Sequence, residues 1–231
     1  ANTCGAAELK GLTLRQRLAQ LLMVGVADAA DARGVVQAEQ IGGIFIGSWS
    51  DLSMLTDGSA RKIAAGAKTP LMVSVDQEGG RVSRLKNLGI DWPSARQLVA
   101  QGKTPEQVRQ LAAENGEKMR KLGITVDFAP VVDVSAESDD QVIGDRSFSD
   151  DPQVVTEYAQ AFAQGLQDAG IMPVFKHFPG HGSGSGDSHL GAVRTPPLSE
   201  LVQSDLVPYR TLLAEPGNAG VMVGHLIVPG L

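Results

Sequence analysis

A short glycine-rich segment contains most of the chain's few histidines. It reads KHFPGHGSGSGDSHLG from Lys176 to Gly191 and contains three of the four histidines, His177, His181 and His189. Imidazole is the side chain whose charge changes most readily near neutral pH, so this cluster indicates acid–base chemistry or metal binding. The glycines give the loop the freedom to move over a ligand.

Asp187 and His189 lie two residues apart at the far end of this loop. In an extended segment such residues point the same way. An aspartate that accepts a hydrogen bond from one imidazole nitrogen fixes the tautomer, and the other nitrogen can then exchange a proton with a substrate. The pair is therefore a candidate acid/base dyad. Two alternatives stay open: a metal held by the histidines, although no HExxH helix or nearby cysteine accompanies them, and histidines that only cap turns.

Two further polar segments carry candidate binding residues. DQEGGRVSR begins with Asp76, whose carboxylate at a strand end can accept two sugar hydroxyls; the alternative is an ordinary turn. GDRSFSDDP contains Arg146, whose planar guanidinium can hold a hydroxyl or a carboxylate. The alternative for Arg146 is a structural salt bridge to Asp145 or Asp150.

Six short apolar runs alternate with helical patterns along the chain. The runs start at Leu21, Ile41, Leu71, Ile124, Ile171 and Ala219. Continuous apolar runs of this length are typical of strands buried on both faces of a parallel sheet. Helices are predicted over 104–123, with Thr104 as the N-cap and Gly123 just past the end, over 152–170, and over 208–214.

This alternation predicts an α/β fold, and the positions of the polar residues favour one architecture. A doubly wound dinucleotide fold would place GxGxxG directly after the first strand, and no such motif follows the run from Leu21. A (β/α)8 TIM-type barrel instead collects polar side chains at the ends of many strands. Asp76, Asp133, Lys176 and His225 have such positions, so the barrel is preferred.

Composition excludes several classes of protein. A chain of 231 residues with no linker or repeat predicts one domain over 1–231, and a net charge of −6 disfavours a nucleic-acid partner. No apolar run approaches the ~20 residues needed to span a bilayer, and the N-terminus does not resemble a signal peptide. Cys4 is the only cysteine, so it is either a free thiol or pairs with a cysteine on a segment outside the chain.

Taken together, the ordered motifs resemble glycoside hydrolase family 3, in particular its bacterial β-N-acetylglucosaminidase (β-hexosaminidase) branch. The motifs are LRQRLAQLLMVG, IGGIFIG, VDQEGGRVSRL, VDFAPVVDV, GDRSFSDDP and KHFPGHGSGSGDSH. The resemblance implies a (β/α)8 barrel that removes terminal β-linked N-acetylglucosamine from peptidoglycan-derived fragments with retention of configuration. The implied partner is a small carbohydrate, a muropeptide or a disaccharide, and no cofactor or metal is implied.

The resemblance also assigns roles to individual residues. His189 becomes the acid/base, supported by Asp187. The residues that would bind the sugar are Asp76, Arg84, Arg146, Lys176 and His177.

The chain departs from the family pattern at the nucleophile. About six strands are found, as in a barrel truncated before its last strands, and no aspartate matches the nucleophile motif, which we expect beyond Leu231. Two other functions stay open: a β-glucosidase of the same family, and a catalytically silent muropeptide-binding module. An extracytoplasmic or cell-envelope location is favoured over a cytoplasmic one.

Overall fold

The computed structural model describes residues 5–187, 189–214 and 217–231, so Cys4 lies outside the described residues. The chain divides into two compact units. Unit 1 comprises Ala1–Val75 with Met119–Val126, and unit 2 comprises Asp76–Lys118 with Asp127–Leu231. The expectation of one catalytic domain over 1–231 stays a prediction.

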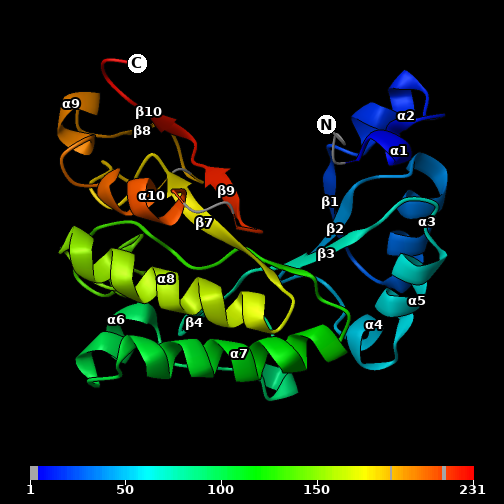
Figure 1. Cartoon of the computed structure of the whole chain (residues 1–231), viewed down its shortest axis with the longest axis horizontal. Helices are drawn as coiled ribbons and strands as arrows, with labels where there is room; N and C mark the ends of the chain where they lie inside the picture. The colour runs from blue at the N-terminus through cyan, green and yellow to red at the C-terminus, as the bar shows by residue number, and fades with distance from the viewer. Residues whose placement is uncertain (1–4, 188, 215–216) are drawn as a thin grey trace. The chain divides into compact units, whose positions relative to one another are not determined.

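Unit 1 is built from short strands that alternate with helices. Its elements are α1 (Ala6–Leu9), α2 (Leu14–Ala19), β1 (Met23–Val26), α3 (Ala29–Glu39), β2 (Gly43–Ile46), α4 (Ser53–Thr56), α5 (Ser59–Gly66) and β3 (Met72–Val75). The three strands pair in parallel, with Val26, Ile46 and Val75 in one register. These three side chains are fully buried, and α3 and α5 lie side by side along the unit (Figure 1). Burial of the strands explains their continuous apolar sequence.

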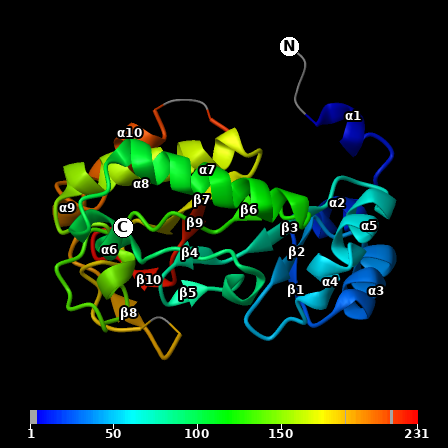
Figure 2. The same ribbon diagram turned by 90° about the horizontal axis from the view of Figure 1, so that it is seen from below.

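Unit 2 carries the polar motifs. Its elements are β4 (Gln77–Gly79), β5 (Val82–Ser83), η1 (Lys86–Leu88), α6 (Ala95–Ala100), most of α7 (Pro105–Lys121), η2 (Gly144–Arg146), α8 (Pro152–Asp168), β7 (Met172–Phe178), β8 (Val193–Arg194), α9 (Leu198–Leu201), α10 (Val207–Leu212), β9 (Gly220–Val223) and β10 (Leu226–Ile227). β7 pairs in parallel with β9, and the register shifts between Lys176 and Phe178. β4 and β5 form a small antiparallel hairpin (Figure 2).

The parallel strands follow the order β1-β2-β3-β6-β7-β9, which is their order along the chain. β6 (Val126–Asp127) lies at the boundary between the units. Just before it, the Thr125 amide donates to the Val73 carbonyl in unit 1, and after it the Val174 amide donates to the Ala129 carbonyl in unit 2. Each predicted apolar run therefore supplies one strand of an α/β fold, and the sequential order has no switch point of the doubly wound kind.

The predicted helices are confirmed, with small changes at their ends. Thr104 and Gln107 exchange backbone-to-side-chain hydrogen bonds of 2.9 and 3.2 Å at the start of α7, which is the capping box read from the sequence. Gly123 has φ +93° just after this helix, where a side chain would be strained. The third helix, α10, begins one residue earlier and ends two residues earlier than expected. Among the described residues, no helix combines the length and apolarity needed to cross a membrane.

Gly165 allows α8 to approach α7 closely. A Cβ atom at this position would lie only 2.7 Å from the Cβ of Ala112 and would also meet the backbone of Arg109. These neighbours belong to a helix backbone and to a short side chain, so they cannot rotate away. The contact matters because α8 also packs against β7, the strand that carries Lys176 and His177.

We expect Gly165→Ala to destabilise the protein although alanine is the better helix former. Overpacking costs about 1–3 kcal/mol in a tight contact. Gly34→Ala is the matched control, because Gly34 lies inside α3 with nothing near its missing Cβ. The control should gain up to about 1 kcal/mol from helix propensity. Urea denaturation of both variants measures the difference, and equal effects would contradict the close packing.

Candidate active site

The centre of the site is the buried ammonium group of Lys176 in β7. Its Nζ lies 2.9 Å from Oδ1 of Asp76 and 2.6 Å from Oε1 of Glu78. Asp76 follows β3, and Glu78 lies in the β4–β5 hairpin that comes next. The Lys176 side chain is 3% exposed and that of Glu78 6%, whereas that of Asp76 is 25% exposed. Asp76 is therefore the member of this group that solvent or a ligand can reach.

Arg146 forms a bidentate ion pair with Glu78. Its Nε and Nη2 each donate to a different carboxylate oxygen of Glu78 at 2.8 Å, and its Nη1 donates to the Val142 carbonyl at 3.1 Å. The short η2 helix, which ends at Arg146, presents the guanidinium in this direction. The alternative of a salt bridge to Asp145 or Asp150 is wrong, because Arg146 pairs with Glu78 and Asp145 pairs with Arg81 at 2.9 Å.

Burial and charge act in opposite directions in this cluster. Burial would raise the pKa of Glu78, but the charge of Lys176 and the hydrogen bonds from Arg146 lower that pKa to about 2. Burial likewise opposes the charged form of Lys176, yet Glu78 and Asp76 raise its pKa above the ordinary value. Glu78, Lys176 and Arg146 are consequently ionised at neutral pH, and each charge stabilises its neighbour of opposite sign.

The partly exposed His177 and the buried Asp133 form a second pair beside the first. Nδ1 of His177 lies 2.6 Å from Oδ2 of Asp133, while the backbone amides of His177 and His181 donate to Oδ1 at 3.2 and 2.8 Å. Burial works to raise the pKa of Asp133, but His177 and the amides outweigh it and lower that pKa. Because an ionised carboxylate only accepts, Nδ1 of His177 carries the proton in this contact, and Nε2 of the same ring lies 3.5 Å from Nη2 of Arg146.

Asp127 is a buried acid beneath the charged groups. It ends β6, is fully buried, and its Oδ1 accepts from the Gln77 amide at 2.9 Å. Among the described residues, its Oδ2 has no hydrogen-bond partner. Burial, with smaller effects of Asp76 and Glu78, raises the pKa of Asp127 well above its usual value against the opposing pull of the Gln77 amide and Lys176. The site therefore contains one carboxyl that resists ionisation.

Asp187 and His189 meet as predicted, but in a turn rather than in an extended segment. Oδ1 of Asp187 accepts from the His189 backbone amide and lies 2.9 Å from its Nδ1, and the Leu190 amide donates to the Asp187 carbonyl. These hydrogen bonds from His189 lower the pKa of Asp187. The His189 side chain is 89% exposed. Nε2 is thus left free for a ligand.

The structure brings together four of the sequence-predicted binding residues and leaves one apart. Asp76, Arg146, Lys176 and His177 belong to one network through Glu78. Arg84 is not joined to it by a hydrogen bond, since its buried Nε has no partner among the described residues. The Asp187–His189 pair follows on the same loop, and within the described residues no hydrogen bond or ion pair joins it to the network. The role of each residue stays a prediction.

Sequence reasoning missed three carboxyls of the site. Glu78 lies in the quoted DQEGGRVSR motif, where the following glycines suggested a simple turn. Asp133 was noted at a strand end without a partner, and Asp127 is an acidic residue within the apolar run from Ile124. The sequence signal that could have identified all three is an acidic residue at the end of an apolar, strand-like run. A carboxyl buried at such a position needs a nearby cation or has to take up a proton.

A metal site does not fit the described residues. The rings of His177 and His181 lie 5.9 Å apart in an edge-on contact. No group of three or more His, Cys, Asp or Glu side chains in residues 5–187, 189–214 and 217–231 is arranged to hold a metal ion. The histidine-metal alternative therefore has no support in this part of the chain.

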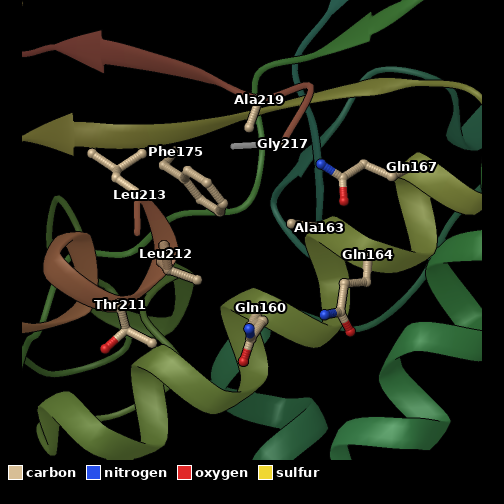
Figure 3. A pocket seen from close by; sticks show the side chains of 10 residues that line it. All are labelled: Gln160, Ala163, Gln164, Gln167, Phe175, Thr211, Leu212, Leu213, Gly217 and Ala219. Carbon is tan, nitrogen blue, oxygen red and sulfur yellow. The ribbon is translucent and has the colours of Figure 1, made fainter. Parts of the chain in front are cut away.

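A separate pocket of about 300 Å³ opens between α8, α10 and the start of β9 (Figure 3). Its lining residues are Gln160, Ala163, Gln164, Gln167, Phe175, Thr211, Leu212, Leu213, Gly217 and Ala219. None of these side chains titrates or acts as a strong nucleophile. The chemistry available to the protein therefore lies in the charged network and its loop, not in this hollow.

We expect Glu78→Gln to destabilise the protein strongly, because it leaves Lys176 and Arg146 buried with less compensation. Removing one partner of a buried ion pair costs about 3–5 kcal/mol. Asp168→Asn is the control, since it breaks the exposed pair with Arg109 and should cost at most about 1 kcal/mol. Urea denaturation at several pH values measures both.

The pH dependence of the Glu78 effect has a defined sign. The folded-state pKa of Glu78 is lowered, so its stabilisation is present above the ordinary glutamate pKa and is lost as pH falls toward about 2. The difference between wild type and Glu78→Gln should therefore shrink on acidification. A difference that is small at neutral pH would refute the buried network.

We expect Asp127→Asn to stabilise the protein increasingly as pH rises. The pKa of Asp127 is raised on folding, so the wild type loses stability above pH ~4, by up to about 1.4 kcal/mol per pH unit, until the folded-state pKa is reached. Asparagine does not titrate and keeps an oxygen for the Gln77 amide. Asp140→Asn is the control, because the Ser138 hydroxyl lowers the pKa of that exposed carboxylate. Equal pH profiles for the two variants would contradict the assignment.

Comparison with known proteins identifies the family. Residues 13–231 match the model of the glycosyl hydrolase family 3 N terminal domain. Beta-hexosaminidase LpqI of Mycobacterium tuberculosis is 62% identical over 221 residues, which make up 95% of this chain and 56% of the relative. The chain thus spans little more than half the length of this curated relative.

Solved structures agree with the sequence match. A family 3 glycosyl hydrolase from Mycobacterium smegmatis has a TM-score of 0.93 and 62% identity, covering 96% of this chain and 67% of that one. A family 3 beta-N-acetylglucosaminidase from Paenibacillus has a TM-score of 0.85 and 34% identity, covering 95% and 43%. The α/β fold, the ordered motifs and these matches together show that the chain belongs to glycosyl hydrolase family 3.

Proposed function

We propose that the full-length protein is a retaining exo-β-N-acetylglucosaminidase. Its substrate would be a peptidoglycan-derived fragment that carries a terminal β-linked N-acetylglucosamine. The activities in the relatives' names, beta-hexosaminidase and beta-N-acetylglucosaminidase, support the reaction. The observation that carries the proposal is the Asp187–His189 contact of 2.9 Å, on the loop that begins at Lys176 of the buried network. In this arrangement, one loop would carry both the proton-transfer pair, Asp187 and His189, and the start of the sugar-binding network at Lys176.

The buried network would bind the sugar. Asp76 offers a partly exposed carboxylate for ring hydroxyls, and Lys176 fixes its orientation from below. Arg146 and His177 lie next to this pair, so the sugar would meet polar groups that are already oriented. Such groups cost little reorganisation when charge develops on the sugar in the transition state. Arg84 is proposed as a further binding residue on the strength of the family resemblance.

His189 would serve as the acid/base. Asp187 accepts from Nδ1, which leaves Nε2 to give a proton to the glycosidic oxygen and later to take one from water. Most retaining glycosidases use a carboxylic acid here, so a histidine–aspartate pair is a departure from the general scheme. A neutral imidazole can approach an anionic substrate without the repulsion that a second carboxylate would meet.

The nucleophile is proposed to lie on a residue of the full-length protein outside these 231 residues. A retaining mechanism requires a free carboxylate on the opposite face of the sugar. In the described network, Glu78 is paired with two cations, Asp133 accepts from His177 and two amides, and Asp127 is fully buried with a raised pKa. These three carboxyls are unsuited to attack. A closed (β/α)8 barrel, with the nucleophile on a later strand, fits this reading.

A panel of chromogenic β-glycosides tests the function in the full-length protein. Turnover of the N-acetylglucosaminide with retained configuration, followed by nuclear magnetic resonance, is the expected result. Preference for the glucoside would instead favour a β-glucosidase. Calorimetric binding of N-acetylglucosamine without any turnover would favour a silent binding module. Release of N-acetylglucosamine from a purified muropeptide addresses the natural substrate, and cell fractionation addresses the proposed envelope location.

We expect Asp187 and His189 to act as one unit. Asp187→Ala and His189→Ala should each lower the rate by about 10²–10⁴-fold. The double variant should be little slower than the slower single variant, because groups that act together are not additive. Activated aryl glycosides should suffer less, because their leaving groups need less protonation.

Leu190→Ala is the control for the loop. Leu190 is 88% exposed beside His189, so its truncation disturbs the same turn without removing a polar contact. The control should keep a rate close to wild type. Losses that add fully in log rate would rule out the dyad.

A further inference from the structure

Asp205 and Tyr209 form a small polar group behind the segment that leads from Lys176 into the histidine loop. Asp205 precedes α10 and is 2% exposed, and Tyr209 lies in α10 and is 3% exposed. The Tyr209 ring packs edge-on against Phe178, with ring centres 5.1 Å apart. The carboxyl of Asp205 lies against Gly180, where a Cβ atom would come within 2.6 Å of Oδ1.

Neither group is fully paired within the described residues. Oδ1 of Asp205 and Oη of Tyr209 are buried without a hydrogen-bond partner there, while Oδ2 of Asp205 accepts from the Ser204 hydroxyl. Burial raises the pKa of Asp205; the charge of Asp133 adds to this, and the Ser204 hydroxyl opposes it. Two neighbouring carboxyls thus have opposite tendencies, because His177 and the amides stabilise the charge on Asp133.

Gly180 connects Asp205 to the site. It lies between His177 and His181, whose backbone amides both donate to Oδ1 of Asp133. Its φ of +142° and the nearby Asp205 leave no room for a side chain. The segment is therefore held on one side by Asp133 and on the other by Asp205, so a shift at Asp205 would move both amides and the His177 ring.

We propose that Asp205 is a positioning residue whose carboxyl group fixes the His177–His181 segment from behind and keeps His177 in contact with Asp133. The inference rests on the proposed function for its catalytic consequence. Its structural part stands independently of that function. Asp205 does not touch the sugar in this proposal and acts only through the segment at Gly180.

The test compares Asp205→Asn, Asp205→Ala and Tyr209→Phe in the full-length protein. Asparagine keeps the shape of the side chain and the acceptor for Ser204, so this variant should retain kcat/KM within about threefold. Alanine removes the support, and a displacement of about 1 Å in a catalytic site can cost about 100-fold. We expect a loss of about 10–100-fold, mainly in kcat. Tyr209→Phe removes an equally buried polar atom without touching Gly180 and should leave kcat/KM unchanged.

A second measurement does not depend on turnover. Nitrogen-15 spectra of the His177 ring report whether Nδ1 still carries its proton and donates it in a hydrogen bond to Asp133. The ring signals should be as in wild type for Asp205→Asn and Tyr209→Phe, and shifted for Asp205→Ala. Asp205→Asn with the same losses as Asp205→Ala would show that charge is required and would overturn the proposal. Unchanged ring signals in folded Asp205→Ala would also overturn it, whereas an inactive wild type with the expected spectra would count against the proposed function alone.

Discussion

The buried charge of Lys176 is the constraint on which the site depends. An ammonium group that is 3% exposed is stable only with compensating anions, and Asp76 and Glu78 supply them at 2.9 and 2.6 Å. Glu78 has a second cationic partner in Arg146, which donates to both of its carboxylate oxygens. Three segments far apart in the sequence are thereby tied to one point: the end of β3 with its hairpin, the η2 turn, and β7.

The remaining carboxyls are sorted by their surroundings. Asp133 stays ionised because a histidine and two backbone amides stabilise its charge, whereas Asp127 and Asp205 are pushed toward the neutral form by burial. The same side chain thus has two different roles within one site, and the difference arises from the number of donors that each carboxyl receives. A net excess of buried negative charge is avoided in this way.

The loop that carries His189 contrasts with the network below it. Lys176 in β7 is held by ion pairs with Asp76 and Glu78, and His177 contacts Asp133 through Nδ1, while His189 is largely exposed and contacts Asp187. This division fits the proposed glycosidase, in which the network would bind the sugar and His189 would have to reach the bond between the sugar and its leaving group. The Asp133 and Asp205 contacts on either side of Gly180 mark where the rigid part gives way to the loop.

The sequence alone predicted the six strands of the parallel sheet, three of the helices and four residues that the structure joins in one network. Each of the six apolar runs contains a strand of the parallel sheet, with β2 and β6 largely buried and β9 partly exposed, and the capping pair Thr104 and Gln107 acts within a single turn. The family motifs pointed to Asp76, Arg146, Lys176 and His177, which the structure joins in one network. Local periodicity and short motifs are sufficient for such features because the interactions that produce them are close in the sequence.

Only the tertiary structure decided which charges meet. Arg146 has Asp145 beside it in the sequence, yet it pairs with Glu78, 68 residues away, while Asp145 pairs with Arg81. The partners of Asp133, the raised pKa of Asp127 and the place of Asp205 behind Gly180 also follow from folding. The physical reason is that burial and the positions of donors set the cost of a charge, and neither quantity is defined until distant segments of the chain come together.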